Sequence, residues 1–244
     1  MVRRVRDPLG SGLEDVACVR ATRFDPEPLP GVTAFRLSYR LGAEPDRDAL
    51  DCLLPEEVER MHKFHFVDDR VRYAATRSTL RRLLGRALEL EPARVPLETA
   101  AAGKPLVAAE LGLEFNVSHS GGEGIVALCR AGRVGVDVEQ MRQDIDHRAL
   151  SARVFAPAEL EEFDGLDDAA ARHRFYRGWV YKEAVLKALG LGIGAETRSF
   201  AILERDALEI VTEPGALPVP ASRLHLVALS APAGYCAALA YVSD

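Results

Sequence analysis

Gly135-Val136-Asp137-Val138-Glu139 predicts a buried β-strand in the middle of the chain. Successive side chains of a strand point to opposite faces, so Val136 and Val138 are expected on one face and Asp137 and Glu139 together on the other. Neighbouring carboxylates repel each other unless positive charge lies between them, and oxygen ligands of this kind suit Mg²⁺. The segment alone is equally compatible with a strand whose acidic face is simply solvated.

A helical segment carries a second group of charged residues. In Trp179-Val-Tyr-Lys182-Glu183-Ala-Val-Leu-Lys187, helical spacing places Trp179, Glu183 and Lys187 on one face, and Lys182 lies about a quarter-turn from Glu183. One acid and two ammonium groups can therefore reach a common site for a metal ion and a phosphate. An amphipathic helix with an exposed Glu-to-Lys pair and a core tryptophan would show the same pattern.

A polar strand end and a lysine in a turn form the third group. Ser118 and His119 lie just before two glycines in Phe115-Asn-Val-Ser-His-Ser-Gly-Gly122, where their side chains can hydrogen-bond phosphate oxygens. Gly103-Lys104-Pro105 predicts a turn that holds a fixed positive charge. A Ser-His-Asp hydrolase triad is disfavoured, because neighbouring side chains on a strand point apart and the G-x-S-x-G elbow is missing.

Arginines follow the predicted helix 68–90, and most of them are assigned to a solvated surface. They are Arg70, Arg72, Arg77, Arg81, Arg82 and Arg86. Arg72, together with Arg60 and Lys63 just before this helix, is favoured as a contact for an anion that binds nearby.

The predicted order of elements, a strand followed by helices and then by further strands, occurs twice along the chain. The predicted strands are residues 32–39, 114–118, 125–129, 134–138, 200–203, 207–211, 224–229 and 235–242, and the predicted helices are 55–66, 68–90, 148–154, 157–166 and 168–189. Four residues recur at an offset of 110: Val117, Ser120, Gly124 and Ala127 return as Val227, Ser230, Gly234 and Ala237.

This duplication predicts an α/β (α+β) protein of two similar lobes in a pseudo-twofold arrangement. Residues 1–133 would form the N-terminal lobe, with 1–31 as an irregular arm, and residues 134–244 the C-terminal lobe. Ligand sites favour lobe interfaces, so the active site is expected in the cleft between the two lobes.

Composition disfavours several classes of protein. The 244-residue chain has a net charge of -6 and so lacks the Lys and Arg excess of a nucleic-acid binder. No run approaches the roughly 18 apolar residues of a membrane span, and the basic start leads into no signal-peptide core. Four widely spaced cysteines signal neither a disulfide framework nor a zinc site. We expect a cytoplasmic protein.

In this order and spacing, the segments resemble the Sfp-like 4'-phosphopantetheinyl transferases. The similarity spans residues 54–192 and includes Gly103-Lys104-Pro105, Phe115–Ser120, Gly135–Glu139 and Trp179-x-x-Lys182-Glu183-x-x-x-Lys187. The resemblance implies transfer of the 4'-phosphopantetheine moiety of coenzyme A to a serine of an acyl or peptidyl carrier protein, with release of 3',5'-ADP. It also implies Mg²⁺, or Mn²⁺ in its place, as the cofactor.

The same resemblance implies roles for individual residues. The metal would be held by Asp137, Glu139 and Glu183. The phosphates of coenzyme A would contact Ser118 and His119, and its adenine would contact Lys104 and Pro105. Arg72 would approach the 3'-phosphate region, and Lys187 the pyrophosphate. In the mechanism that we expect, Glu183 or a water held by the metal would take the serine proton, while Lys187 and Lys182 offset charge on the leaving group. Glu57 stands where some relatives have a lysine for the 3'-phosphate, so Arg60 or Lys63 is expected there instead.

Two other functions stay open on the sequence. A metal-dependent nucleotide pyrophosphatase would use the same carboxylates with water as the nucleophile, and a non-catalytic module would bind coenzyme A or a carrier protein without turnover. A monomer is expected in each case, because two similar lobes already form the cleft that two subunits would otherwise build.

Overall fold

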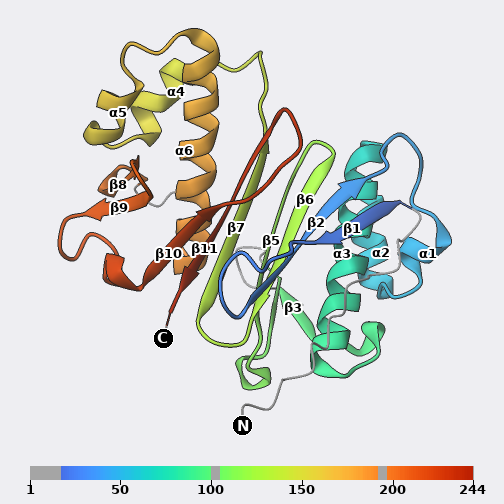
Figure 1. The fold of residues 1–244 in the computed structure, drawn as a ribbon. Helices are drawn as coiled ribbons and strands as arrows, with labels where there is room; N and C mark the ends of the chain where they lie inside the picture. Colours follow the sequence, from blue (N-terminus) through green and yellow to red (C-terminus); the bar gives the residue numbers. More distant parts are fainter. Residues whose placement is uncertain (1–17, 100–104, 192–196, 244) are drawn as a thin grey trace.

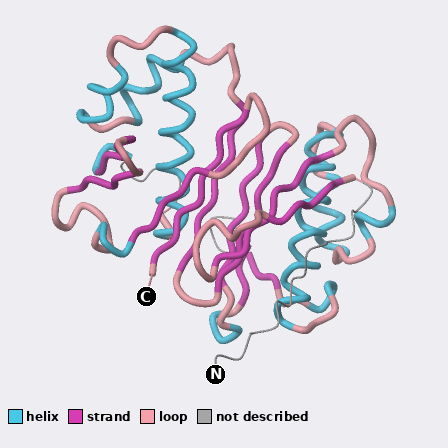
Figure 2. The backbone as a smooth tube through the Cα atoms, in the orientation of Figure 1, coloured by secondary structure: helices cyan, strands magenta, loops and turns pink. Residues whose placement is uncertain are grey.

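The computed structural model describes residues 18–99, 105–191 and 197–243 of the chain. It confirms the predicted mixture of helices and strands. Two antiparallel sheets stand side by side in the middle of the molecule, and helices flank them on both sides (Figure 1). Figure 2 shows this division by element type, with the strands central and most of the helices in two outer groups.

The first sheet has the strand order β1-β2-β6-β5. Its strands are β1 (Val19–Arg23), β2 (Val32–Tyr39), β5 (Glu114–Ser120) and β6 (Glu123–Cys129), and its helices are α1 (Arg47–Leu50), α2 (Pro55–His62) and α3 (Val67–Leu88). Phe35, Leu83 and Val126 belong to the core that joins α3 to this sheet. A small hairpin of β3 (Leu97–Thr99) and β4 (Pro105–Val107), with 3-10 turns at Pro92–Arg94 and Ala109–Leu111, lies between α3 and β5 in the chain.

The second sheet has the strand order β10-β11-β7. It consists of β7 (Arg133–Gln140), β10 (Leu224–Ala228) and β11 (Tyr235–Val242). Its helices are α4 (His147–Val154), α5 (Pro157–Phe163) and α6 (Asp168–Leu189). A separate hairpin of β8 (Phe200–Glu204) and β9 (Leu208–Thr212) and 3-10 turns at Thr197–Ser199 and Ala221–Arg223 complete this part of the chain. Val185, Ile202 and Ala238 belong to the core beneath α6.

The two sheets share one arrangement. Apart from the additional edge strand β1, the first strand of each sheet (β2 or β7) pairs with the last (β6 or β11), which pairs with the middle one (β5 or β10). A helix of 22 residues (α3 or α6) packs nearby in each case. The 110-residue offset relates β5 to β10, but the loop of residues 229–234 is longer than the two-residue turn between β5 and β6. The division of the chain at residues 133 and 134 stays a prediction.

Most predicted elements lie where the pattern placed them, but the arm 1–31 is not irregular throughout. Val19–Arg23 forms β1 and pairs with β2 in antiparallel register. Exposed and less exposed side chains alternate along β1, as expected for an edge strand. Val19 is on the less exposed side and belongs to the core between the first sheet and α3. The flanking prolines and glycines hid this short alternation, and the equally short α1, β3 and β4 were also not predicted.

The sheets meet where β5 lies against β7, and side chains hold this seam. The Asn116 Oδ1 atom accepts a hydrogen bond from the Val136 backbone N–H at 3.0 Å, and the Ser118 and Ser120 hydroxyls accept from the N–H groups of Val138 at 3.4 Å and Gln140 at 3.2 Å. Buried backbone N–H groups need such partners. Alternate residues of β5 thus satisfy the strand edge that β7 turns away from β11.

Gly135 brings α6 directly onto β7. A Cβ atom at this position would lie 2.1 Å from the Ala184 carbonyl oxygen and 2.4 Å from the Ala188 nitrogen, both of which are backbone atoms of α6. The hydrogen of glycine is therefore what allows this approach. Because Val136 and Val138 point into the core between the sheets, Asp137 faces the same side as Gly135, under the helix.

We predict that Gly135→Ala pushes α6 away from β7. It should lower the free energy of unfolding by about 1–3 kcal/mol or more, because the obstructing atoms are backbone and cannot rotate aside. Gly122→Ala is the matched control, since a Cβ there meets only the Tyr235 hydroxyl at 3.7 Å, and its effect should stay within about 0.5 kcal/mol. Urea denaturation measures both, and equal losses would contradict this account of the packing.

Candidate functional site

Asp137 and Lys187 form an ion pair at the seam. The Lys187 Nζ atom lies 2.6 Å from Asp137 Oδ1, and it also donates to the Val136 carbonyl oxygen and the Ser118 hydroxyl, each at 3.2 Å. Ser118 in turn donates to Asp137 Oδ1 at 2.8 Å. Residues from β5, β7 and α6 that are far apart in the sequence therefore share one hydrogen-bonded cluster.

Two further carboxyl groups adjoin this cluster. Glu139 Oε2 accepts a hydrogen bond from the Ser120 hydroxyl at 2.7 Å. Burial raises the pKa of Glu139 and of Glu183, and the charge of Asp137 raises both pKa values further. Burial also raises the pKa of Asp137, against the opposing effect of Lys187. The ionised forms of all three carboxyl groups are therefore less stable here than in water, because the nearby positive charge does not fully compensate for burial and mutual repulsion.

The donor set suits a divalent cation in its chemistry. Asp137 Oδ2 is buried and has no hydrogen-bond partner among the described residues, and added positive charge would relieve the repulsion among the three carboxylates. Within the described residues, however, no three His, Cys, Asp or Glu side chains converge closely enough to hold a metal ion by themselves. Lys187 and Ser120 instead occupy oxygens of Asp137 and Glu139.

A cavity of about 370 Å³ lies on the other side of β5. It is lined by Arg60, Phe64, Tyr73, Thr76, Arg77, Leu80, Pro105, Val117 and His119. Of the predicted contacts of the ligand, Arg60, Pro105 and His119 come together here. Burial, followed by the nearby charges of Arg72 and Lys187, lowers the pKa of His119, so that its imidazole is neutral near pH 7.

The other predicted contacts lie elsewhere. Arg72 donates to the Gly121 carbonyl oxygen at 3.0 Å and to Asp69 at 2.6 Å, which places it at the turn after β5, close to His119. Lys63 is a surface residue whose side chain is 71% exposed and pairs with Glu59. Lys104 falls outside the described residues.

Lys182 was predicted to contact the ligand, but the structure brings it neither to the seam nor to the cavity beside β5. Its side chain is 1% exposed, and its Nζ atom pairs with Glu159 at 2.8 Å and donates to the carbonyl oxygens of Thr197 and Phe200. Glu159 also accepts from the backbone N–H of Ala156 and Ile202, so the pair joins α6 to α5 and β8. Lys182 and Lys187 leave α6 in different directions, and only Lys187 reaches the seam.

Most arginines of this helix were predicted to lie on a solvated surface, but Arg77 lines the cavity instead. The Arg77 side chain is 12% exposed and pairs with Glu57, which also pairs with the buried Arg81. The available signal was spacing, since residues 73, 77 and 81 follow one another at four-residue intervals and share a face of α3. That this face turns towards α2 and the cavity could only be seen in the folded chain.

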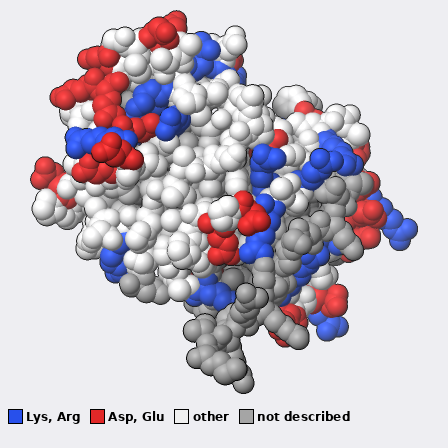
Figure 3. Space-filling view, in the orientation of Figure 1, with Lys and Arg blue, Asp and Glu red and all other residues white. Residues whose placement is uncertain are grey.

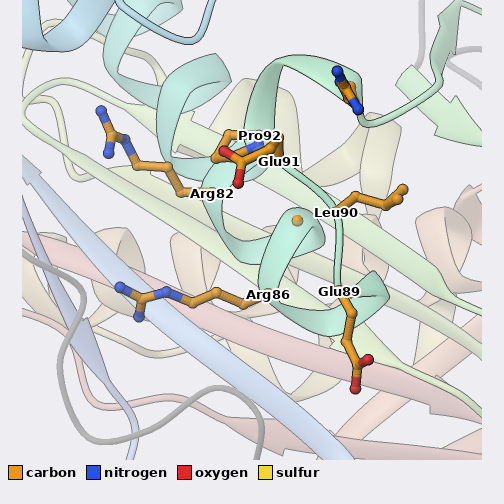
Figure 4. Close-up of a pocket in the computed structure, with 8 residues that line it drawn as sticks. Arg82, Arg86, Glu89, Leu90, Glu91 and Pro92 are labelled. Atoms are coloured by element: carbon orange, nitrogen blue, oxygen red, sulfur yellow. The ribbon is translucent and has the colours of Figure 1, made fainter.

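A second cavity, of about 560 Å³, lies at the end of α3 and contains none of the predicted residues. Arg82, Gly85, Arg86, Glu89, Leu90, Glu91, Pro92 and Arg94 line it. In Figure 4 Arg82 and Arg86 extend to the same side, whereas Glu89 and Leu90 point in other directions. The charged groups do not converge on one point, so we assign no function to this cavity.

Charge is unevenly spread over the molecule. Lys, Arg, Asp and Glu side chains gather mainly over the helical regions of the face in Figure 3, and the surface over the strands between them is mostly uncharged. Among the described helices, none is long and apolar enough to cross a membrane. Cys18, Cys52, Cys129 and Cys236 are all buried and free of disulfides.

Comparison with known proteins identifies the family. Residues 133–240 match the model of the 4'-phosphopantetheinyl transferase superfamily, and residues 45–130 match that of the 4'-phosphopantetheinyl transferase N-terminal region. The 4'-phosphopantetheinyl transferase HetI of Nostoc sp. is 35% identical over 172 residues, which cover 69% of this chain and 73% of the relative. The chain therefore belongs to the 4'-phosphopantetheinyl transferase superfamily and is an enzyme of that class.

Two further proteins show how far the likeness extends. A phosphopantetheinyl transferase of Thraustochytrium sp. is 34% identical, with 67% of this chain and 62% of that protein covered. The crystal structure of a holo-(acyl-carrier-protein) synthase from Bacillus anthracis in complex with CoA (3',5'-ADP) is 18% identical. It aligns with a TM-score of 0.40, covering 47% of this chain and 97% of that one.

We predict that Lys187→Met destabilises the fold through Asp137. Removing the ammonium leaves a buried carboxylate without its counter-charge, and because the Lys187 side chain is 28% exposed we expect a loss of about 1–3 kcal/mol. The double variant Asp137→Asn/Lys187→Met should recover most of this loss.

Lys63→Met is the control for this cycle, since it breaks an exposed pair and should change the free energy of unfolding by less than about 1 kcal/mol. Urea denaturation of the single and double variants gives the coupling energy. A coupling energy of zero between Asp137 and Lys187 would show that the ion pair does not hold the seam.

Proposed function

We propose that this chain transfers the 4'-phosphopantetheine moiety of coenzyme A to a serine of an acyl or peptidyl carrier protein, releasing 3',5'-ADP. The observation that carries the proposal is the cluster of Asp137, Lys187 and Ser118, which joins both sheets beside two further carboxyl groups. Family membership supplies the reaction class, and the cluster supplies charged groups that such a transfer needs in one place.

Coenzyme A would lie across β5. Its pyrophosphate would face Ser118 and Lys187 on the seam side, and its nucleotide would enter the cavity that contains Arg60, Pro105 and His119. Ser118 and His119 are neighbours on a strand, so their side chains serve the two sides separately. This arrangement explains how one short segment can contact two parts of a long ligand.

Mg²⁺, or Mn²⁺ in its place, would be held by Asp137, Glu139 and Glu183 and would supply positive charge to the pyrophosphate oxygens. Support comes from the unpartnered Asp137 Oδ2 atom and from the raised pKa values of the three carboxyl groups. Mg²⁺ commonly takes one or two carboxylates together with substrate phosphates and water, so a complete protein cage is not required.

The chain's own residues would position the reacting groups and accept the proton. The serine hydroxyl oxygen of the carrier attacks the phosphorus next to pantetheine, a new P–O bond forms, and the bond to the 5'-phosphate of the nucleotide breaks. Glu183 would receive the serine proton, and the Lys187 ammonium would stabilise negative charge on the departing 3',5'-ADP. Positioning and charge neutralisation dominate such transfers.

We further propose that the protein acts in the cytoplasm as a monomer. The four free cysteines among the described residues are consistent with a reducing compartment. The two similar sheets already meet along β5 and β7, so both sides of the site come from one chain.

The proposal predicts a covalent change in an apo carrier protein. Incubation with this enzyme, coenzyme A and MgCl₂ should add the mass of one phosphopantetheine group, as measured by intact mass spectrometry, and a carrier with Ala at the acceptor serine should stay unmodified. Consumption of coenzyme A at the same rate without any carrier would instead identify a pyrophosphatase.

Glu183→Gln should abolish most of the transfer while coenzyme A still binds. We expect kcat to fall about 100-fold or more, because the variant keeps the shape of Glu183 but loses the carboxylate that takes the proton. Glu161→Gln, a change of the same type at an exposed position of α5, should leave kcat unchanged. An unaltered kcat in Glu183→Gln would remove this residue from the mechanism.

A further inference from the structure

Ser120 makes two hydrogen bonds across the seam between β5 and β7. Its hydroxyl donates to Glu139 Oε2 at 2.7 Å and accepts from the backbone N–H of Gln140 at 3.2 Å. Ser118 makes the same two kinds of contact, with Asp137 and with the N–H of the residue that follows it. Alternate serines of β5 therefore hold the two carboxylates of β7 in one repeated pattern.

The two contacts of Ser120 support each other. A hydroxyl group has one proton to donate and two lone pairs that accept. Because the Gln140 N–H bonds to the oxygen, the single proton is free to be donated to the carboxylate. The 2.7 Å separation from Glu139 is that of a hydrogen bond to an ionised acceptor, which is stronger than a bond between neutral groups.

Glu139 depends on such hydrogen bonds more than Asp137 does. Asp137 is paired with the Lys187 ammonium at 2.6 Å, whereas Glu139 forms no ion pair with any of the described residues. A further hydrogen bond to Glu139 comes from the side chain of Trp179, on α6. Neutral side chains from β5 and α6, and not a cation, therefore orient this carboxylate.

The position of Ser120 is itself fixed by the second sheet. Ser120 ends β5 and precedes the turn of Gly121 and Gly122, in which Gly121 has a left-handed φ of 55°. A Cβ atom at Gly121 would lie 2.6 Å from the Tyr235 hydroxyl oxygen, which accepts from the Gly122 N–H at 2.9 Å. Tyr235 lies on β11, opposite Gln140 of β7. The serine hydroxyl and the strand that it bonds are therefore tied together through β11.

We propose that Ser120 is a positioning residue for Glu139, and that its hydroxyl fixes the carboxylate in the orientation that binds Mg²⁺. The inference rests on the proposed function, in which Glu139 is one of the three carboxylates that hold the metal. Hydrogen-bond partners of metal ligands orient them, and their loss commonly costs about ten- to a hundredfold in metal affinity. An ionised carboxylate has about four lone-pair sites, so the bond from Ser120 leaves room for a cation.

The test measures Mn²⁺ binding, with MnCl₂ as the probe and the electron paramagnetic resonance signal of free Mn²⁺ as the readout. Coenzyme A is present at saturation, and no carrier protein is added. Ser120→Ala should weaken Mn²⁺ binding about ten- to a hundredfold. Ser120→Thr keeps the hydroxyl and should recover most of the affinity. Binding of coenzyme A with EDTA present, measured by calorimetric titration, should be unchanged in Ser120→Ala.

Ser38→Ala is the matched control. Ser38 is a half-buried serine of β2 whose hydroxyl donates to Glu123 Oε2 at 3.1 Å, and β2 lies two strands from β5 in the sheet order. Its loss should leave Mn²⁺ binding as in wild type. Ser120→Ala should still fold, because Gln140 is exposed and water can replace the lost acceptor of its N–H.

Transfer to a carrier protein gives a second readout. Ser120→Ala should raise the MgCl₂ concentration for half-maximal rate by a similar factor, while kcat at saturating MgCl₂ stays near that of wild type. The reason is that the hydroxyl acts through the metal site and not on the reacting atoms. A merely structural role would lower kcat at every MgCl₂ concentration.

Equal Mn²⁺ affinities of wild type and Ser120→Ala, a matching loss in Ser38→Ala, or no recovery in Ser120→Thr would overturn the inference. These outcomes leave the mass assay with wild-type enzyme unaffected, so they are distinguishable from failure of the proposed transfer. A wild-type enzyme that binds no Mn²⁺ would remove the metal assignment, and this inference with it.

Discussion

Three side chains of β5 satisfy the open edge of β7, and the arrangement of the site depends on this seam. Had the two strands paired through their backbones, they would lie about 4.8 Å apart and form one continuous sheet. Asn116, Ser118 and Ser120 stand between them instead and supply the acceptors that the β7 N–H groups require. Hydroxyl groups are thereby fixed next to Asp137 and Glu139. The contact that joins the sheets also builds the polar site.

Among the described residues near this site, several buried charged side chains lie in ion pairs. Asp137 lies against Lys187, Glu159 against Lys182, and Glu57 against both Arg77 and Arg81. An isolated buried charge would be strongly unfavourable, so each pair tolerates desolvation only through these contacts. The pairs differ in what remains unsatisfied. The Lys182 pair is closed by backbone carbonyls, whereas one oxygen of Asp137 has no hydrogen-bond partner among the described residues.

Local pattern was sufficient for much of the fold. Alternation in Gly135–Glu139 correctly placed Val136 and Val138 in the core and Asp137 on the opposite face. The 3.6-residue period found α3 and α6 with ends within about two residues. The same reasoning did not show where Lys182 and Arg77 lie, because a helix has several faces and periodicity does not say which neighbour covers each one. It also missed β1, since a five-residue edge strand is defined by its partner more than by its own residues.

The sequence by itself determined the strands and helices, the family and the kinds of side chain available for the chemistry, because these follow from local periodicity and from ordered motifs. Only the tertiary structure decided which charges meet. Ser118, Asp137 and Lys187 come from three elements and converge because Gly135 lets the backbone of α6 lie directly against β7. Such close packing between two elements cannot be read from the spacing of residues in the sequence. Glu57 likewise pairs with Arg77 and Arg81 and is not a surface acid, because α2 packs its carboxylate against α3.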